Sequence, residues 1–168
     1  MSDGFDDEVD SDFPSPDDAA RDPIAARRKA MDLLASREYC RRELVTRLGK
    51  AGFPPDIAES SVAELAGEGL VDDERFAESL LRSRAGRGQG PARIRRELRE
   101  RGVEAELADR ILGESAEDWI ELARSVRQKK FGSRQPDTFA KKAKQVRFLE
   151  YRGFTHEQVR AAVGGGDD

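Results

Sequence analysis

One short motif occurs three times in the chain at a nearly constant interval. Gly52-Phe53, Gly102-Val103 and Gly153-Phe154 lie 50 and 51 residues apart, and a leucine stands four residues before each glycine. Apolar residues recur at spacings of three and four on both sides of each motif, a pattern typical of amphipathic helices. A repeat of this length buries little apolar surface alone, so it depends on stacking against its neighbours.

This periodicity predicts an all-α fold. We expect three tandem three-helix repeats that form an elongated, curved, right-handed array, with boundaries at residues 23–71, 72–115 and 116–163. Charged residues make up 38% of the chain and aromatic residues only 7%, which favours an elongated body over one compact core. No sustained alternation of apolar and polar residues rich in Val, Ile and Thr is present, so strands are not expected.

Several helix ends are marked by local signals. Asp72 is a favourable N-cap, and Pro91 stands at a first helical position, where its missing N–H is harmless. Thr155 and Gln158 have the spacing of a capping box. Cys40 occupies a cap position at which serine would be better. The three motif glycines are expected to end their helices in the left-handed conformation.

The net charge of −4 conceals a strong asymmetry along the chain. Residues 1–22 contain nine Asp or Glu and one Arg, whereas residues 23–166 carry a net charge of +6. We interpret residues 1–22 as a disordered acidic arm and residues 164–168 as a flexible tail. The arm is either a solvated end or a competitor for the ligand of the basic body. A basic body favours a polyanion or an acidic protein surface as partner.

The compartment follows from what the sequence lacks. With a single cysteine, Cys40, no intramolecular disulfide can form, which fits a reducing environment. Residues 1–22 have no apolar core of a secretory signal, and no stretch approaches the roughly 18 apolar residues of a membrane span. We therefore expect a cytoplasmic protein that does not contact membranes.

Candidates for catalysis are few. Cys40 and His156 fall in the first and third repeats, which an extended array would keep apart, so a nucleophilic pair is not favoured. The acids at positions 72–74 suit a helix N-terminus better than a magnesium site. The glycine-rich segment 86–91 lacks the strand and the Lys-Ser/Thr of a phosphate loop and is interpreted as an elbow. We predict no enzymatic activity, no metal and no cofactor.

Clusters of basic side chains are the strongest functional signal. Residues 75–101 contain nine Arg and three Glu, and residues 124–152 contain ten Lys or Arg and two acids. Such faces are either ordinary solvated helix surfaces or contacts to an anionic partner, and their clustering favours the second interpretation. Phe76, Leu98 and Trp119 are expected in the core. The candidate contact residues are Arg82, Arg84, Arg87, Arg93, Arg96, Lys129, Lys130, Lys141, Lys142 and Arg147.

Four segments, taken in order across residues 24–163, resemble a known family. They are Arg37-Glu38-Tyr39-Cys40-Arg41-Arg42-Glu43-Leu44, Asp72-Asp73-Glu74-Arg75-Phe76-Ala77, Gly90-Pro91 with Arg93-Ile94 and Glu97-Leu98, and Arg147-Phe148-Leu149 with Arg152-Gly153-Phe154 and Gln158-Val159. Together they are similar to the RecX family of bacterial regulatory proteins. Cys40 stands where that family more often has serine, and the acidic arm lies outside the family's common part.

The resemblance implies a crescent of three tandem repeats that binds the filament of RecA recombinase on single-stranded DNA, in its helical groove. It further implies inhibition of ATP hydrolysis, strand exchange and coprotease activity, and hence a role in homologous recombination, DNA repair and the SOS response. We expect a monomer whose basic faces bridge neighbouring RecA subunits, with direct binding to single- or double-stranded DNA as an additional property.

Two other classes of function remain as alternatives. A non-specific DNA-binding protein would also use three-helix units that resemble helix-turn-helix folds, and it would bind naked DNA with steep salt dependence. A nuclease would need a metal site that the sequence does not suggest. For the regulator, charge reversal at Arg84, Arg93 and Arg96 is expected to abolish inhibition without unfolding the chain.

Overall fold

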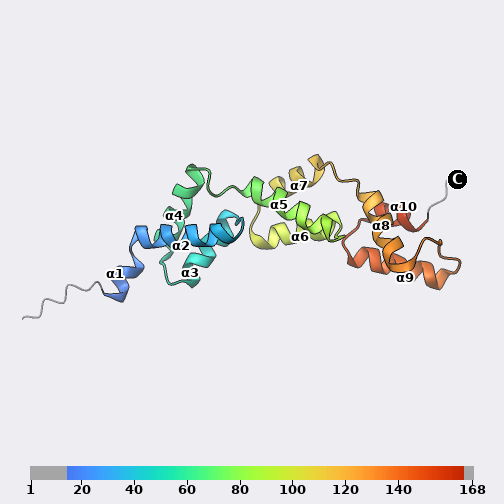
Figure 1. Ribbon diagram of the computed structural model, residues 1–168, viewed down its shortest axis with the longest axis horizontal. Helices are drawn as coiled ribbons and strands as arrows, with labels where there is room; N and C mark the ends of the chain where they lie inside the picture. Colours follow the sequence, from blue (N-terminus) through green and yellow to red (C-terminus); the bar gives the residue numbers. More distant parts are fainter. Residues whose placement is uncertain (1–14, 165–168) are drawn as a thin grey trace, which may run out of the picture.

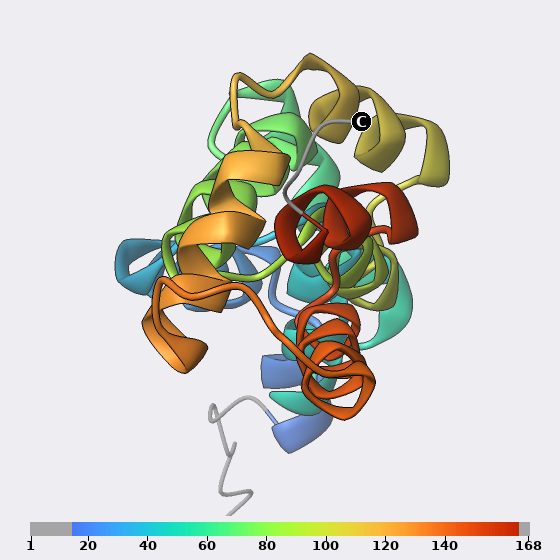
Figure 2. The same ribbon diagram turned by 90° about the vertical axis from the view of Figure 1, so that its right-hand side faces the viewer.

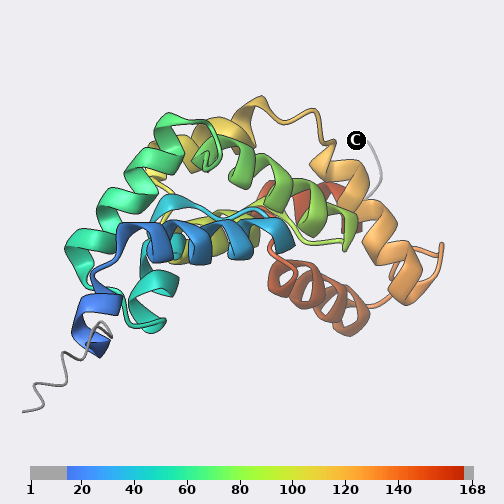
Figure 3. The same cartoon turned by 60° about the vertical axis from the view of Figure 1, so that its left-hand side comes forward.

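Three helical bundles follow one another along an elongated array (Figure 1). The structure is a computed structural model that describes residues 15–164, and within this range all regular elements are helices. Figure 3 shows that the array has the shape of an arch. In the view along its length, the bundles lie one behind another (Figure 2). The helices are α1 (Pro16–Ala20), α2 (Pro23–Ser36), α3 (Arg41–Lys50), α4 (Pro55–Gly67), α5 (Asp73–Gly86), α6 (Pro91–Arg101), α7 (Ala105–Glu114), α8 (Trp119–Phe131), α9 (Phe139–Tyr151) and α10 (His156–Val163).

Each bundle consists of three consecutive helices. The first contains α2–α4, the second α5–α7 and the third α8–α10, and the extensive helix–helix packing occurs within these groups. The predicted all-α fold of three tandem three-helix repeats is therefore confirmed. None of the helices in residues 15–164 has the length and apolar character required to span a membrane.

Each repeat has a hydrophobic core of its own. Leu44, Leu48 and Leu65 belong to the first core. The expected core residues Phe76 and Leu98 are buried in the second, and Trp119 packs on that core from α8 while remaining partly exposed. The third core is formed around α8, α9 and α10. Burial of apolar surface thus stabilises each repeat separately, and the contacts between repeats are a different, smaller set.

The helix-end signals in the sequence are confirmed. The carboxylate of Asp72 accepts the N–H of Arg75 at 3.1 Å. Thr155 and Gln158 form the reciprocal capping box, with N···O distances of 3.4 and 2.9 Å. The motif glycines Gly52, Gly102 and Gly153 have φ values of +102°, +102° and +95°, the left-handed region in which other residues are strained.

The prediction of a disordered arm is wrong for residues 15–22. Ser15 and Asp18 form a capping box at the start of α1, and the carboxylate of Asp22 accepts the N–H of Ile24 at the start of α2. Sequence composition alone missed these local hydrogen bonds, which satisfy the backbone donors of both helix starts. Residues 1–14 lie outside the described residues. Of the expected flexible tail, only Gly164 is described, and it closes α10.

The joint between the second and third repeats is made by main chain. The N–H groups of Gly90 and Ala92, at the start of α6, donate to the carbonyl oxygens of Arg152 and Gly153 at 2.8 and 2.9 Å. The two glycines allow this approach, because a Cβ atom at Gly153 would lie 2.7 Å from the backbone nitrogen of Arg93. This joint is therefore tight and tolerates no added side chain.

The joint between the first and second repeats occupies the equivalent place but relies on side chains. The thiol of Cys40, at the start of α3, donates to the carbonyl oxygen of Arg101 at 2.9 Å. The backbone N–H of Arg41 donates to Asp73 at 2.7 Å, and Arg75 pairs with Glu38 at 2.7 Å. Burial raises the pKa of the Cys40 thiol, which keeps it protonated as a donor. Cysteine at this cap position thus links two repeats instead of capping α3.

Candidate partner-binding surface

A basic groove runs across the joint between the second and third repeats. It has a volume of about 840 Å³ and is lined from α5, α6, the elbow between them and the end of α9. Five arginines and three glutamates line it, which leaves a positive balance, and Tyr151 forms part of its wall. Four of the predicted contact residues, Arg84, Arg87, Arg93 and Arg96, are therefore brought together with an aromatic side chain from a different repeat.

The packing of α6 aims the arginines at this groove. Ile94 and Leu98 face the core of the second repeat and are buried, which leaves the other sides of α6 to solvent. Arg93 and Arg96 are three residues apart and share one of those sides. Arg87 follows the last turn of α5, where Gly88 adopts a φ of +79° and turns the chain towards α6. The predicted elbow at residues 86–91 is thus what positions Arg87.

Tyr151 was missed by the sequence interpretation. Its side chain is 76% exposed, and the Arg93 guanidinium carbon lies 5.5 Å from the centre of its ring. This is a cation–π contact between the second and third repeats. Arg147, one of the predicted contact residues, is exposed one helical turn before Tyr151. The only signal in the sequence was an aromatic residue at the end of a basic helix, directly before the motif Arg152-Gly153.

Arg84 lines the same groove but is bound within the fold. It donates two hydrogen bonds to the Glu97 carboxylate, at 2.6 and 2.8 Å, and the two side chains are only 17% and 23% exposed. The Arg84 guanidinium holds the pKa of the Glu97 carboxyl below its usual range. Arg101 adds a third hydrogen bond to Glu97 at 3.0 Å. Reversing the charge of Arg84 would place two carboxylates together, so this residue is unsuited to a test of partner binding.

Replacing Glu97 with glutamine is expected to destabilise the chain by roughly 1–3 kcal/mol at neutral pH, because Arg84 would lose a charged partner while half-buried. The ion pair stabilises the fold above the ordinary pKa of a glutamate. Its contribution is lost as the pH falls through the lowered pKa of Glu97 in the folded state. Urea denaturation at several pH values should therefore show a difference between the two proteins at pH 7 that shrinks in acid.

Asp109→Asn is the matched control, since Asp109 pairs with Arg95 on the exposed surface of the same repeat. It should change stability less than Glu97→Gln does, because solvent screens the exposed pair. Equal losses for the two variants, or a difference independent of pH, would contradict the structural role of the Arg84–Glu97 pair.

A second basic pocket adjoins the groove. It has a volume of about 300 Å³ and is lined by Lys129 and Lys130 of α8 together with Arg87 and Arg152. Arg87 lines both hollows, so the five predicted residues Arg87, Arg93, Arg96, Lys129 and Lys130 lie around one joint. We call this set the joint surface.

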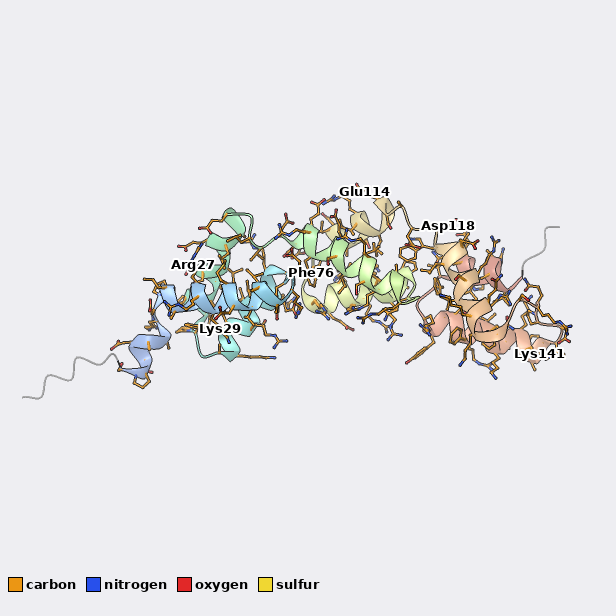
Figure 4. All side chains as sticks on the ribbon, viewed as in Figure 1. Arg27, Lys29, Phe76, Glu114, Asp118 and Lys141 are labelled. Atoms are coloured by element: carbon orange, nitrogen blue, oxygen red, sulfur yellow. The ribbon has the colours of Figure 1, made fainter. Side chains whose placement is uncertain are left out.

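The remaining candidates lie elsewhere. Arg82 lines a different pocket of about 510 Å³ with Glu78 and Glu114, in an acidic environment. Lys141 lies in the first turn of α9, away from the joint (Figure 4), and its ammonium pairs with the Asp137 carboxylate at 2.7 Å. Lys142 is exposed on the same helical turn. The ten predicted residues therefore do not form a single face, and only the joint surface concentrates them.

The side chains of the joint surface are suited to anions. Guanidinium and ammonium groups donate charge-assisted hydrogen bonds to carboxylates or phosphates. In residues 15–164 no cluster of His, Cys, Asp and Glu has the arrangement of a metal site. Cys40 and His156, the two residues considered for nucleophilic chemistry, belong to different repeats, and Cys40 is buried at a joint.

Comparison with known proteins identifies the family. Models of the first, second and third three-helix domains of RecX match residues 26–65, 72–112 and 116–163. Regulatory protein RecX of Halorhodospira halophila is 45% identical over 144 residues, covering 86% of this chain and 89% of that protein. Regulatory protein RecX of Pseudomonas entomophila is 43% identical over 145 residues, covering 86% and 94%.

Solved structures agree at the level of the fold. A crystal structure of regulatory protein RecX superposes with a TM-score of 0.73 at 24% identity, covering 86% of this chain and 73% of that one. RecX from Lactobacillus salivarius also gives a TM-score of 0.73, at 18% identity, covering 85% and 95%. With three matched domains and close relatives along most of its length, the chain belongs to the RecX family of regulatory proteins.

Proposed function

We propose that this chain regulates RecA recombinase by binding the filament that RecA forms on single-stranded DNA. In this proposal it inhibits ATP hydrolysis, strand exchange and coprotease activity, and so limits homologous recombination and the SOS response. It acts in the cytoplasm by contact alone, without catalysing a reaction. The coarse part of this proposal, a regulatory role, is supported by the family to which the chain belongs.

The observation that carries the proposal is the position of the joint surface. It straddles two repeats whose joint is held by two backbone hydrogen bonds, so the cations on both sides keep a constant spacing. A partner that fills it must offer carboxylates or phosphates at matching intervals. A repeating filament of an anionic nucleoprotein offers such groups at regular positions.

The mechanism follows from binding alone. If the joint surface contacts groups of neighbouring RecA subunits, it binds one arrangement of those subunits more tightly than another. The bound regulator then shifts the filament towards that arrangement, by as much as its affinities for the two differ. Inhibition thus requires a preference between filament states and no chemical step.

The deciding experiment is a titration of this protein into RecA that hydrolyses ATP on single-stranded DNA. The hydrolysis rate is expected to fall, and a fall at substoichiometric amounts would point to action at filament ends or to propagation along the filament. An unchanged rate at excess regulator would refute the proposed inhibition.

Binding to naked DNA is the second candidate, and Tyr151 favours it. An exposed aromatic ring beside an arginine is a stacking platform for an unpaired base, next to cations that suit phosphates. If the ATPase rate stays constant while the protein binds single-stranded DNA with steep salt dependence, this second function replaces the first.

A further inference from the structure

The second basic pocket combines positive charge with an apolar floor. Leu122 and Val126 of α8 and Phe148 of α9 supply apolar surface. Its cations come from α8, from the residue that follows α9 and from the elbow after α5. Among the described residues, its lining contains no carboxylate. Its volume of about 300 Å³ exceeds that of a cavity of about 150 Å³ that is known to hold benzene. The pocket is therefore large enough for one aromatic side chain.

The cations are held beside this floor. The Arg152 side chain donates to the carbonyl oxygen of Arg87 at 3.2 Å, and its guanidinium lies 5.2 Å from the centre of the Phe148 ring. The Lys130 ammonium lies 6.0 Å from the same ring. Phe131 packs edge-on against Phe148 with ring centres 5.3 Å apart, which supports that ring from α8. An occupant that suits this pocket carries an aromatic residue flanked by carboxylates.

The chain itself contains a segment of this kind. Residues 1–14 include six Asp or Glu and no Lys or Arg, and three apolar residues, Phe5, Val9 and Phe13, stand four positions apart. This segment precedes residue 26, where the match to the first RecX domain begins. Its charge is opposite to that of the pocket, and its apolar residues recur at the spacing of neighbours on one helix face.

We propose that residues 1–14 of a second copy of this chain dock on the second basic pocket, with a phenylalanine ring on its apolar floor and carboxylates on its cations. The segment joins the array at α1, beside the first repeat, whereas α8 belongs to the third repeat (Figure 1), and this separation favours docking between two molecules. This association replaces the expected monomer. On the basis of the proposed function, it also covers part of the joint surface and competes with the filament.

Direct binding tests the docking without RecA. A fluorescent peptide of residues 1–14 is titrated with full-length protein in which the acids of the segment are neutralised: D3N, D6N, D7N, E8Q, D10N and D12N. We expect saturable binding that weakens at high salt. Charge reversal of the pocket, K129E with K130E, should weaken peptide binding at least about tenfold. The control R82E, in the acidic pocket on the same array, should leave it unchanged.

Two further measurements separate the parts of the proposal. A peptide with F5A and F13A should lose most of its affinity although its charge is intact, which a purely electrostatic contact would not produce. Sedimentation velocity should show that the unaltered chain associates with rising concentration, and that the neutralised chain does so less. A peptide that fails to bind, binds equally to the K129E/K130E protein, or binds while the chain stays monomeric would overturn the proposal.

A failure of the segment to dock can be told apart from a failure of this protein to inhibit RecA. If the segment does not dock, the titration of RecA ATPase activity can still show inhibition, and the neutralised and unaltered proteins would then inhibit equally. If the segment docks, the neutralised protein should inhibit at lower concentration than the unaltered one, because its joint surface is free.

Discussion

Replacing Gly153 with alanine is expected to destabilise the chain much more than the same change at Gly52. Both glycines end the middle helix of a repeat in the left-handed conformation, with φ values of +95° and +102°. Around Gly52 no atom lies within 4 Å of an added Cβ, whereas at Gly153 such an atom would overlap the backbone of Arg93. The two variants thus share the conformational cost and differ in the steric cost.

The shared cost of a left-handed alanine is about 1–2 kcal/mol. At Gly153 the start of α6 must also move away, which breaks the two backbone hydrogen bonds of the joint and raises the expected loss to roughly 3–5 kcal/mol. The loss of stability for Gly102→Ala should lie between the other two losses, because an added Cβ there meets the side chain of Arg42, which can move in part.

Chemical denaturation of the three alanine variants provides the measurement, and hydrogen exchange locates the loss. Protection should fall mainly in the third repeat and at the start of α6 for Gly153→Ala. Equal destabilisation at Gly52 and Gly153 would show that only the backbone conformation matters, and that the third repeat is not held by a tight main-chain joint.

Features that depend on neighbouring residues in the chain were predictable from the sequence. The cap at Asp72, the capping box of Thr155 and the left-handed glycines all involve partners within a few residues. The period of 50 residues then revealed three repeats, and stacking followed because each unit is small. The same short-range signal was present at Ser15 and Asp18, but the dense acidic composition around it led to a prediction of disorder.

Contacts between distant residues were not predictable in the same way. Arg84 and Glu97 are on different helices, and nothing in the local sequence distinguishes Arg84 from Arg87, which forms no ion pair within residues 15–164. The joint between the second and third repeats depends on main-chain groups, whose partners leave no signal in the composition. Tyr151 contacts Arg93 only because the third repeat brings the two side chains together. Sequence patterns could therefore predict where cations are abundant, but not which of them are free to bind.

Charge reversal of Arg87, Arg93 and Arg96 together is expected to abolish inhibition of RecA while the chain stays folded. Within residues 15–164 none of these three side chains forms an ion pair, whereas Arg84 is paired with Glu97. All three line the groove. Each buried charged contact to a partner is worth about 2 kcal/mol or more, and reversal adds repulsion. The concentration of regulator for half-inhibition of ATP hydrolysis should rise at least about 100-fold.

The matched control reverses three exposed cations of the first repeat, Arg28, Lys29 and Arg47, which changes the net charge equally. It should shift half-inhibition by less than about tenfold, since a change of net charge acts mainly on the rate of encounter. Both variants should unfold cooperatively, and R87E/R93E/R96E should lose only about 1 kcal/mol of stability, because the Arg93–Tyr151 contact is removed. If the two reversals weaken inhibition alike, the basic charge of the whole array acts, and the joint surface has no special part. If a folded R87E/R93E/R96E protein still inhibits, the contact with the filament lies on a different face.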